Sequence, residues 1–180
     1  FFNALKLYEI GHIYSEKQEY FPQEEKWICG AVVRNFKNKN SENIFLDAKG
    51  ALEEFLKKIG SKAYEIRETV SYCPYSHPKK ILGYEYEGMG EFARVFELHP
   101  VIAKNFDLEK REIGIFEINF QKILANGIKE KTYSPIPRYP GITIDISVII
   151  DRKKPVREII KLINQNSLIK ENIFCFAVSL

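Results

Sequence analysis

Hydrophobic and polar residues alternate along residues 5–14, which predicts a β-strand. One face of this strand carries Leu5, Leu7, Gly11 and Ile13, and the other carries Lys6, Tyr8, His12 and Tyr14. Residues 27–33 are nearly all apolar, which is typical of a strand covered on both faces, so we expect this second strand to be central. The chain opens inside its first strand without a preceding cap or turn. We therefore expect further structure upstream of residue 1.

A helix follows the polar run 34–43, which we interpret as a loop. Asp47 is the predicted N-cap residue, because a short acidic side chain can accept a hydrogen bond from a free N–H group of the first turn. Apolar residues then recur at helical spacing, namely Leu52, Phe55, Leu56 and Ile59. Gly60 is the predicted end of the helix.

The next part of the chain alternates between strands and one short helix. Tyr64, Ile66 and Thr69 mark a strand, and the two prolines of residues 71–80 predict an irregular segment. Further strands are expected at 82–86, 94–98 and 113–118, with a helix at 100–105. Strands that enclose a few helices indicate the α+β class.

Three prolines, Pro135, Pro137 and Pro140, predict an extended connection and a domain boundary near Tyr133. We therefore divide the chain into domains 1–132 and 133–180. In the second domain, residues 142–148 alternate strictly, Pro155 opens a helix with Val156, Ile159, Ile160 and Ile163 on one face, and residues 172–178 form a last strand. This order is half of a split βαβ unit. A ferredoxin-like domain needs about twice as many elements, so we expect a truncated one.

The composition is that of an ordinary globular protein, with 45% hydrophobic and 28% charged residues. The net charge of +3 gives weak support to nucleic acid contact. Three scattered cysteines do not form a disulfide framework or a zinc site, and each is interpreted as a small buried side chain. No stretch approaches the roughly 18 apolar residues of a membrane span, and the first residues lack the regions of a signal peptide. We therefore expect a cytoplasmic protein.

Motifs with catalytic or phosphate-binding spacing are weak in this sequence. Gly83, Gly88 and Gly90 lie among strand-like residues, so turn glycines are the simpler interpretation and a phosphate loop is the alternative. The three histidines are too scattered for a common metal site. A basic run, Arg152, Lys153 and Lys154, precedes the last helix and is a candidate contact for tRNA phosphates. A solvent-exposed turn is the alternative for this run.

Five short motifs, in order along the chain, carry a resemblance to one known family. They are Leu-Tyr-Glu-Ile-Gly at 7–11, Phe-Leu-Asp-Ala-Lys-Gly at 45–50, Phe-Glu-Leu-His-Pro at 96–100, Phe-Glu-Ile at 116–118 and Pro-Arg-Tyr-Pro at 137–140. Together they resemble the β subunit of bacterial phenylalanine-tRNA ligase over nearly the whole chain. The matching residues that the family uses structurally are Glu9, Gly11, Asp47, Lys49, His77, Glu97 and His99.

The resemblance implies a class II synthetase-like antiparallel domain without catalytic residues, followed by part of a ferredoxin-like anticodon-binding domain. In that family the α subunit carries the aminoacylation site, and the β region packs against it in a cytoplasmic heterotetramer. ATP and magnesium are implied for the whole enzyme, and no cofactor is expected for this chain alone. Class II enzymes hold ATP with an arginine two residues before an acid. Here Leu7 stands at that place ahead of Glu9, and no Arg-x-Glu occurs in the chain.

The sequence also departs from the family at several positions. Lys79 and Lys80 follow His77-Pro78 where the family has Gly-Arg, and residues 143–145 keep only the acid of an Arg-Arg-Asp motif. The family's aromatic for anticodon stacking has no clear counterpart in residues 176–179, so we expect weak tRNA contact. The alternative function is a free-standing RNA-binding or protein-interaction module that uses the same degenerate fold.

Overall fold

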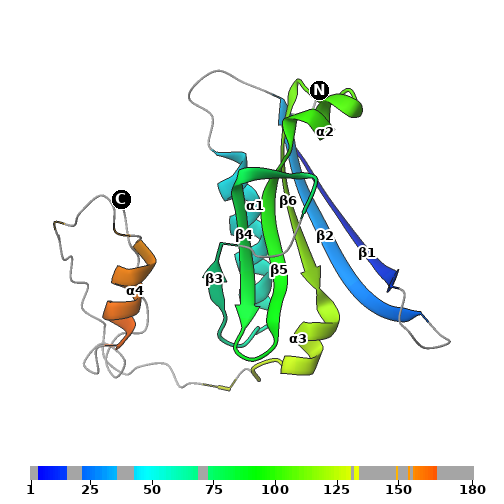
Figure 1. Ribbon diagram of the computed structural model, residues 1–180. Coiled ribbons are helices and arrows are strands. Elements are labelled where there is room, and N and C mark those ends of the chain that lie inside the picture. Colours follow the sequence, from blue (N-terminus) through cyan, green and yellow to red (C-terminus); the bar gives the residue numbers. More distant parts are fainter. Residues whose placement is uncertain are drawn as a thin grey trace. The chain divides into compact units, whose positions relative to one another are not determined.

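The computed structural model describes residues 4–15, 22–35, 43–68, 73–130, 132–133, 149, 154 and 156–165. The chain divides into two compact units, Phe1–Tyr133 and Ser134–Leu180 (Figure 1). The described part of the second unit contains one helix, α4 (Val156–Gln165), at the predicted place. Its Ile159, Ile160 and Ile163 are half-buried. The strands predicted at 142–148 and 172–178 lie outside the described residues.

The first unit is built on a six-stranded sheet in which every neighbouring pair is antiparallel. Its strands are β1 (Ala4–Ser15), β2 (Gln23–Asn35), β3 (Glu65–Arg67), β4 (Ser76–Tyr86), β5 (Gly90–Leu98) and β6 (Arg111–Asn119), in the spatial order β1-β2-β6-β5-β4-β3. The predicted central place of the second strand is confirmed, because β2 lies between β1 and β6. The structure shows the predicted α+β class.

Strand β4 begins well before residue 82, where the sequence predicts it to start. Of the segment expected to be irregular, residues 74–75 form a turn as predicted, but residues 76–80, with Pro78, belong to β4. The register of β4 against β5 shifts between Ser76 and Ile81. Proline has no N–H group to donate to a regular ladder, and a shift of register is a place where a strand tolerates it. At the other end of β4, Gly88 and Gly90 have positive φ and form the turn into β5, which agrees with their interpretation as turn glycines.

Three helices complete the first unit, namely α1 (Ile44–Lys58), α2 (Pro100–Asn105) and α3 (Phe120–Asn126). The predicted cap of α1 is wrong. Asn43 caps the helix, because its side-chain oxygen accepts a hydrogen bond from the Phe45 N–H, and Asp47 lies inside the first turn. Gly60 follows the end of the helix with φ of 72°, as the prediction of a glycine stop requires. The sequence analysis did not predict α3, which Asn119 caps.

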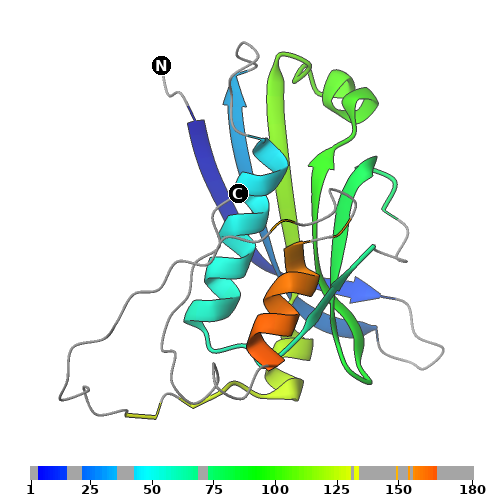
Figure 2. The same cartoon turned by 90° about the vertical axis from the view of Figure 1, so that its left-hand side faces the viewer.

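The hydrophobic core lies between α1 and one face of the sheet. Helix α1 contacts β6, β5 and β2 (Figure 2). Gly114 of β6 permits the close approach, because a Cβ there would lie 2.6 Å from the Ile44 carbonyl oxygen. The fully covered side chains of this core include Leu52, Leu56, Tyr84, Phe92, Val95, Ile118 and Ile123. Gly114 faces α1, and side chains alternate along a strand. The position of Gly114 therefore shows which residues of the sheet face α1 and which face away from it.

Candidate functional site: the sheet face opposite helix α1

A row of polar side chains crosses the sheet on the face opposite α1. The strand registers place Glu9 of β1 beside Cys29 of β2, Cys29 beside Glu117 of β6, and Glu117 beside Arg94 of β5. Glu117 is three residues beyond Gly114 and therefore points away from the helix. Glu9 is exposed, Cys29 is half-buried, and Arg94 and Glu117 are largely buried. Burial thus increases from the edge strand toward the centre of the sheet.

The centre of this row is an ion pair that a tyrosine joins. The Arg94 Nε donates to a Glu117 carboxylate oxygen at 2.6 Å, and the two side chains are 15% and 16% exposed. The Tyr75 hydroxyl donates to Glu117 at 3.0 Å and accepts from the Arg94 guanidinium at 3.1 Å. The Tyr75 ring packs on buried Phe96, with ring centroids 5.4 Å apart. Each charged group is therefore paired within the protein.

The ionisation of these groups opposes nucleophilic or acid–base chemistry near neutral pH. Burial, together with the charges of Glu117 and Glu9, raises the pKa of Cys29 to about 11, so its thiol stays protonated. Burial and the neighbouring Glu117 carboxylate raise the pKa of Tyr75 as well. Burial of Arg94 acts to lower its pKa, but the hydrogen bond that Arg94 donates to Glu117 and the attraction of that carboxylate together outweigh burial, so the pKa is raised. On this face the Cys29 thiol and the Tyr75 phenol are therefore protonated and the Arg94 guanidinium is charged near neutral pH.

Comparison with known proteins decides the family. The description "Phenylalanyl tRNA synthetase beta chain CLM domain" belongs to a family model that matches residues 2–120. The chain belongs to this family. The resemblance derived from the five sequence motifs is therefore confirmed, and the CLM-domain match covers all six strands of the sheet.

Several curated relatives of this CLM-family chain are phenylalanine-tRNA ligase β subunits. Those of Staphylococcus saprophyticus, Carboxydothermus hydrogenoformans and Listeria innocua are 27%, 28% and 29% identical, over 90%, 94% and 93% of this chain. The aligned part is 20–22% of each relative, so the chain spans about a fifth of their length. Among solved structures, prolyl-tRNA synthetase of Giardia lamblia in complex with prolyl-adenylate aligns at 13% identity with a TM-score of 0.46, covering 68% of this chain and 28% of that one.

The family-motif residues of β1 and those of α1 differ in their contacts. Glu9 and Gly11 face away from α1 on exposed β1, and no atom lies within 4 Å of a Cβ built on Gly11. Asp47 accepts a hydrogen bond from the Arg34 guanidinium at 3.0 Å, so it ties the first turn of α1 to β2. Lys49 pairs with Glu53 one turn later at 2.7 Å. These α1 residues stabilise the helix on the sheet.

The motif residues of β4 and β5 also have structural contacts. Glu97 pairs with Lys80 at 2.5 Å across the two strands. The His77 Nδ1 accepts from the Lys79 N–H at 3.2 Å. His99 caps α2 by accepting from the Val101 N–H at 3.2 Å, and this helix lies at the predicted residues 100–105.

The basic run of the second unit is represented by one described residue, the exposed Lys154, while Arg152 and Lys153 lie outside the described residues. Within the described ranges, no group of three or more His, Cys, Asp and Glu side chains could hold a metal ion. None of the described helices is long and apolar enough to cross a membrane.

The sequence analysis did not find the polar row. Its local signal is a charged residue between two apolar neighbours in a strand, as at Arg94 and Glu117. That signal gives no partner, because the row exists only through the pairing of β1, β2, β6 and β5. Nothing in the sequence places Tyr75 in this row, because Tyr75 lies in the segment predicted to be irregular.

Proposed function

We propose that this chain is a non-catalytic part of a phenylalanine-tRNA ligase β subunit that supports assembly with the catalytic α subunit. The observation that carries this proposal is the pairing and protonation of the polar groups on the sheet face opposite α1. Its guanidinium is already paired with Glu117, its thiol is protonated, and Leu7 stands where a class II enzyme has its ATP-binding arginine. The family match and the β-subunit relatives support the subunit role.

The finer parts of the proposal concern fold, tRNA and cofactors. Residues 1–132 are a class II synthetase-like core, and residues 133–180 are part of a ferredoxin-like anticodon-binding domain. Arg152, Lys153 and Lys154 contact tRNA phosphates weakly, and the complete enzyme is a cytoplasmic heterotetramer that uses ATP and magnesium at the α subunit. The basic charge of the run and the β-subunit relatives support these assignments.

Two assays test the proposal. The purified 180-residue chain should give no phenylalanine-dependent ATP–pyrophosphate exchange, because Arg94 is already paired with Glu117 and Leu7 stands at the place of the ATP-binding arginine. The same chain should co-elute with the cognate α subunit in size-exclusion chromatography. An intact parent β chain mixed with the same α subunit is the positive control and should form phenylalanyl-tRNA. Exchange by the chain alone would overturn its non-catalytic assignment, and loss of co-elution while the parent assembles would overturn its role in assembly.

A further inference from the structure

The chain that follows helix α3 is held against the end of helix α1. An isolated antiparallel bridge joins Ser61 to Ile128. The Lys129 N–H donates a hydrogen bond to the Gly60 carbonyl oxygen at 2.8 Å. These contacts join two segments that are far apart in sequence, and both segments lie outside the six strands of the sheet. We call residues 127–130 the strap.

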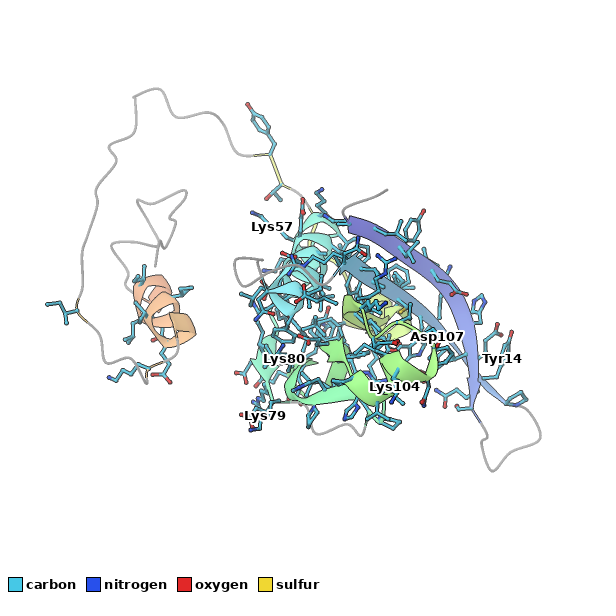
Figure 3. The ribbon with its side chains drawn as sticks, turned by 90° about the horizontal axis from the view of Figure 1, so that it is seen from above. Tyr14, Lys57, Lys79, Lys80, Lys104 and Asp107 are labelled. Atoms are coloured by element: carbon cyan, nitrogen blue, oxygen red, sulfur yellow. The ribbon has the colours of Figure 1, made fainter. Side chains whose placement is uncertain are left out.

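Gly60 is the residue at the end of α1 that makes room for the strap. Its φ of 72° lies in the left-handed region, which favours glycine. A Cβ at this position would lie 2.8 Å from the Lys129 carbonyl oxygen and 3.2 Å from the Ile128 Cγ2. The Gly60 N–H donates to the carbonyl oxygen of Lys57, which Figure 3 labels on α1. Gly60 therefore ends the helix and receives the strap at the same time.

Ser61 connects the strap to the hydrophobic core. Its N–H donates to the carbonyl oxygen of buried Leu56 at 2.9 Å. Its hydroxyl oxygen lies 2.6 Å from the Tyr86 hydroxyl oxygen, and either group can donate. Tyr86 is 2% exposed, and its ring stacks on Phe92 with centroids 3.9 Å apart. A buried hydroxyl without a partner costs free energy, so this hydrogen bond holds Ser61 in place.

The strap itself has few buried contacts. It leaves α3 at Gly127, whose N–H donates to the carbonyl oxygens of Ile123 and Leu124 at 3.1 Å each. Beyond this base, Ile128 is 43% exposed and residues 129–130 are exposed. Segments with few buried apolar contacts open at a lower free energy than the core of a domain. The strap can therefore detach while the sheet stays folded.

We propose that the strap has a closed and an open state and thereby sets the length of the connection between the six-stranded unit and the second unit. In the closed state the contacts with Gly60 and Ser61 hold residues 127–130 on the end of α1. In the open state these residues add up to about 13 Å to the connection, at about 3.3 Å for each residue. A longer connection lowers the effective concentration of one unit near the other. This proposal does not depend on the proposed role as a ligase subunit.

Hydrogen exchange at single amides of the 180-residue chain, followed by NMR spectroscopy, tests the strap. The Lys129 amide should exchange at least about tenfold more slowly than in an unstructured peptide, because it is bonded to Gly60. It should also exchange at least about tenfold faster than the Ile118 amide of central strand β6, because the strap opens before the sheet unfolds. Gly60→Ala should speed Lys129 exchange at least about tenfold more, and the Ile118 amide checks that the sheet remains folded.

Gly88→Ala is the matched control. Gly88 also has a positive φ, of 75°, but no atom lies within 4 Å of a Cβ built on it. This variant therefore introduces the backbone strain without the clash, and Lys129 exchange should stay within about threefold of the parent. Equal acceleration by the two variants overturns the proposal. A parent chain in which Lys129 is unprotected, or exchanges as slowly as Ile118, overturns it too.

Small-angle X-ray scattering tests the length of the connection. The radius of gyration of Gly60→Ala should exceed that of Gly88→Ala by at least about 1 Å, because the open strap lengthens the connection. Equal radii, together with fast Lys129 exchange in Gly60→Ala, would show that the strap opens without lengthening the connection, and the proposal would fail.

A milder pair of variants tests the strap even where Gly60→Ala does not fold. Ser61→Ala and Tyr86→Phe each remove one hydroxyl of the same hydrogen bond. Both should speed Lys129 exchange by similar factors, at least about threefold, because Ser61 then loses its contact with the core. If neither variant changes Lys129 exchange, Ser61 does not anchor the strap and the proposal is wrong.

Discussion

The Arg94–Glu117 pair provides a sharp test of why the polar face is closed. Glu117→Gln keeps the shape of the side chain but removes its charge, and it leaves the Arg94 cation largely buried without a carboxylate. The Tyr75 hydroxyl can still donate to the amide oxygen, so the main loss is the charge-assisted bond from Arg94. A hydrogen bond to a charged group contributes about 1.5–3 kcal/mol, and breaking a buried pair costs about 3–5 kcal/mol. Since both side chains keep some exposure, we expect a loss of about 3 kcal/mol.

Urea unfolding followed by tryptophan fluorescence measures this loss. Trp27 is the single tryptophan of the chain and lies on β2, so it reports on the six-stranded unit. With a urea m-value of about 1.5–2 kcal/mol/M, the midpoint should fall by roughly 1.5–2 M. The matched control is Glu54→Gln, which removes an exposed pair with Lys58 on α1 and should leave the urea midpoint nearly unchanged, because water screens that pair.

The result that refutes this reasoning is equally specific. If Glu117→Gln and Glu54→Gln shift the midpoint by the same amount, the pair does not stabilise the closed face. A double variant, Arg94→Met with Glu117→Gln, distinguishes the cause. It should be more stable than Glu117→Gln alone, because the uncompensated guanidinium is then removed. A double variant that is less stable would instead show that Arg94 contributes through its packing.

Two further predictions concern a close approach and a thiol. Gly114→Ala should lower stability by about 2 kcal/mol in thermal unfolding, because the added Cβ would lie 2.6 Å from the Ile44 carbonyl oxygen, whereas Gly11→Ala in open space should change it by less than about 0.5 kcal/mol. Equal effects would contradict the close packing of α1 on β6. Because the pKa of Cys29 is raised from 9.0 to about 11, its alkylation rate, measured by site-resolved mass spectrometry, should rise through pH 9–11 without a plateau. The neutral thiol is the favoured form in the fold, so its contribution to stability should be lost as pH rises from 9 through 11, and an alkylation plateau below pH 9.5 would refute the raised pKa.

The elements with local signals could be predicted from the sequence. Helix α2 begins at Pro100 because His99 caps it and proline fits the first turn, and both signals lie in adjacent residues. The cap of α1 could not be assigned correctly, since Asn43 and Asp47 are both good cap residues. A tertiary contact distinguishes the two residues: the Asp47 carboxylate accepts a hydrogen bond from Arg34 of β2, and the Asn43 side chain caps the helix.

Helix α3 and the polar row needed information that no local pattern carries. Asn119 ends β6 and also caps α3, so strand and helix adjoin without a loop to separate them. Glu9, Cys29 and Glu117 are distant in sequence and meet only through the register of three strands. A shift of one residue in β2 would move Cys29 to the α1 side and destroy the row. The site therefore depends on the global pairing of the sheet rather than on any motif.

Glu9 links the polar row to β1, the outer strand of the sheet among the described residues. This carboxylate is exposed at β1, yet its charge is one of the causes that raise the pKa of Cys29. A partner that covers β1 would remove water from around Glu9. The Glu9 charge would then be screened less and would act more strongly on the neighbouring Cys29 thiol. The pKa of Cys29 should then rise further on association. Thiol reactivity at one fixed pH thus reports whether β1 is covered, and it does so from a residue on the neighbouring strand β2.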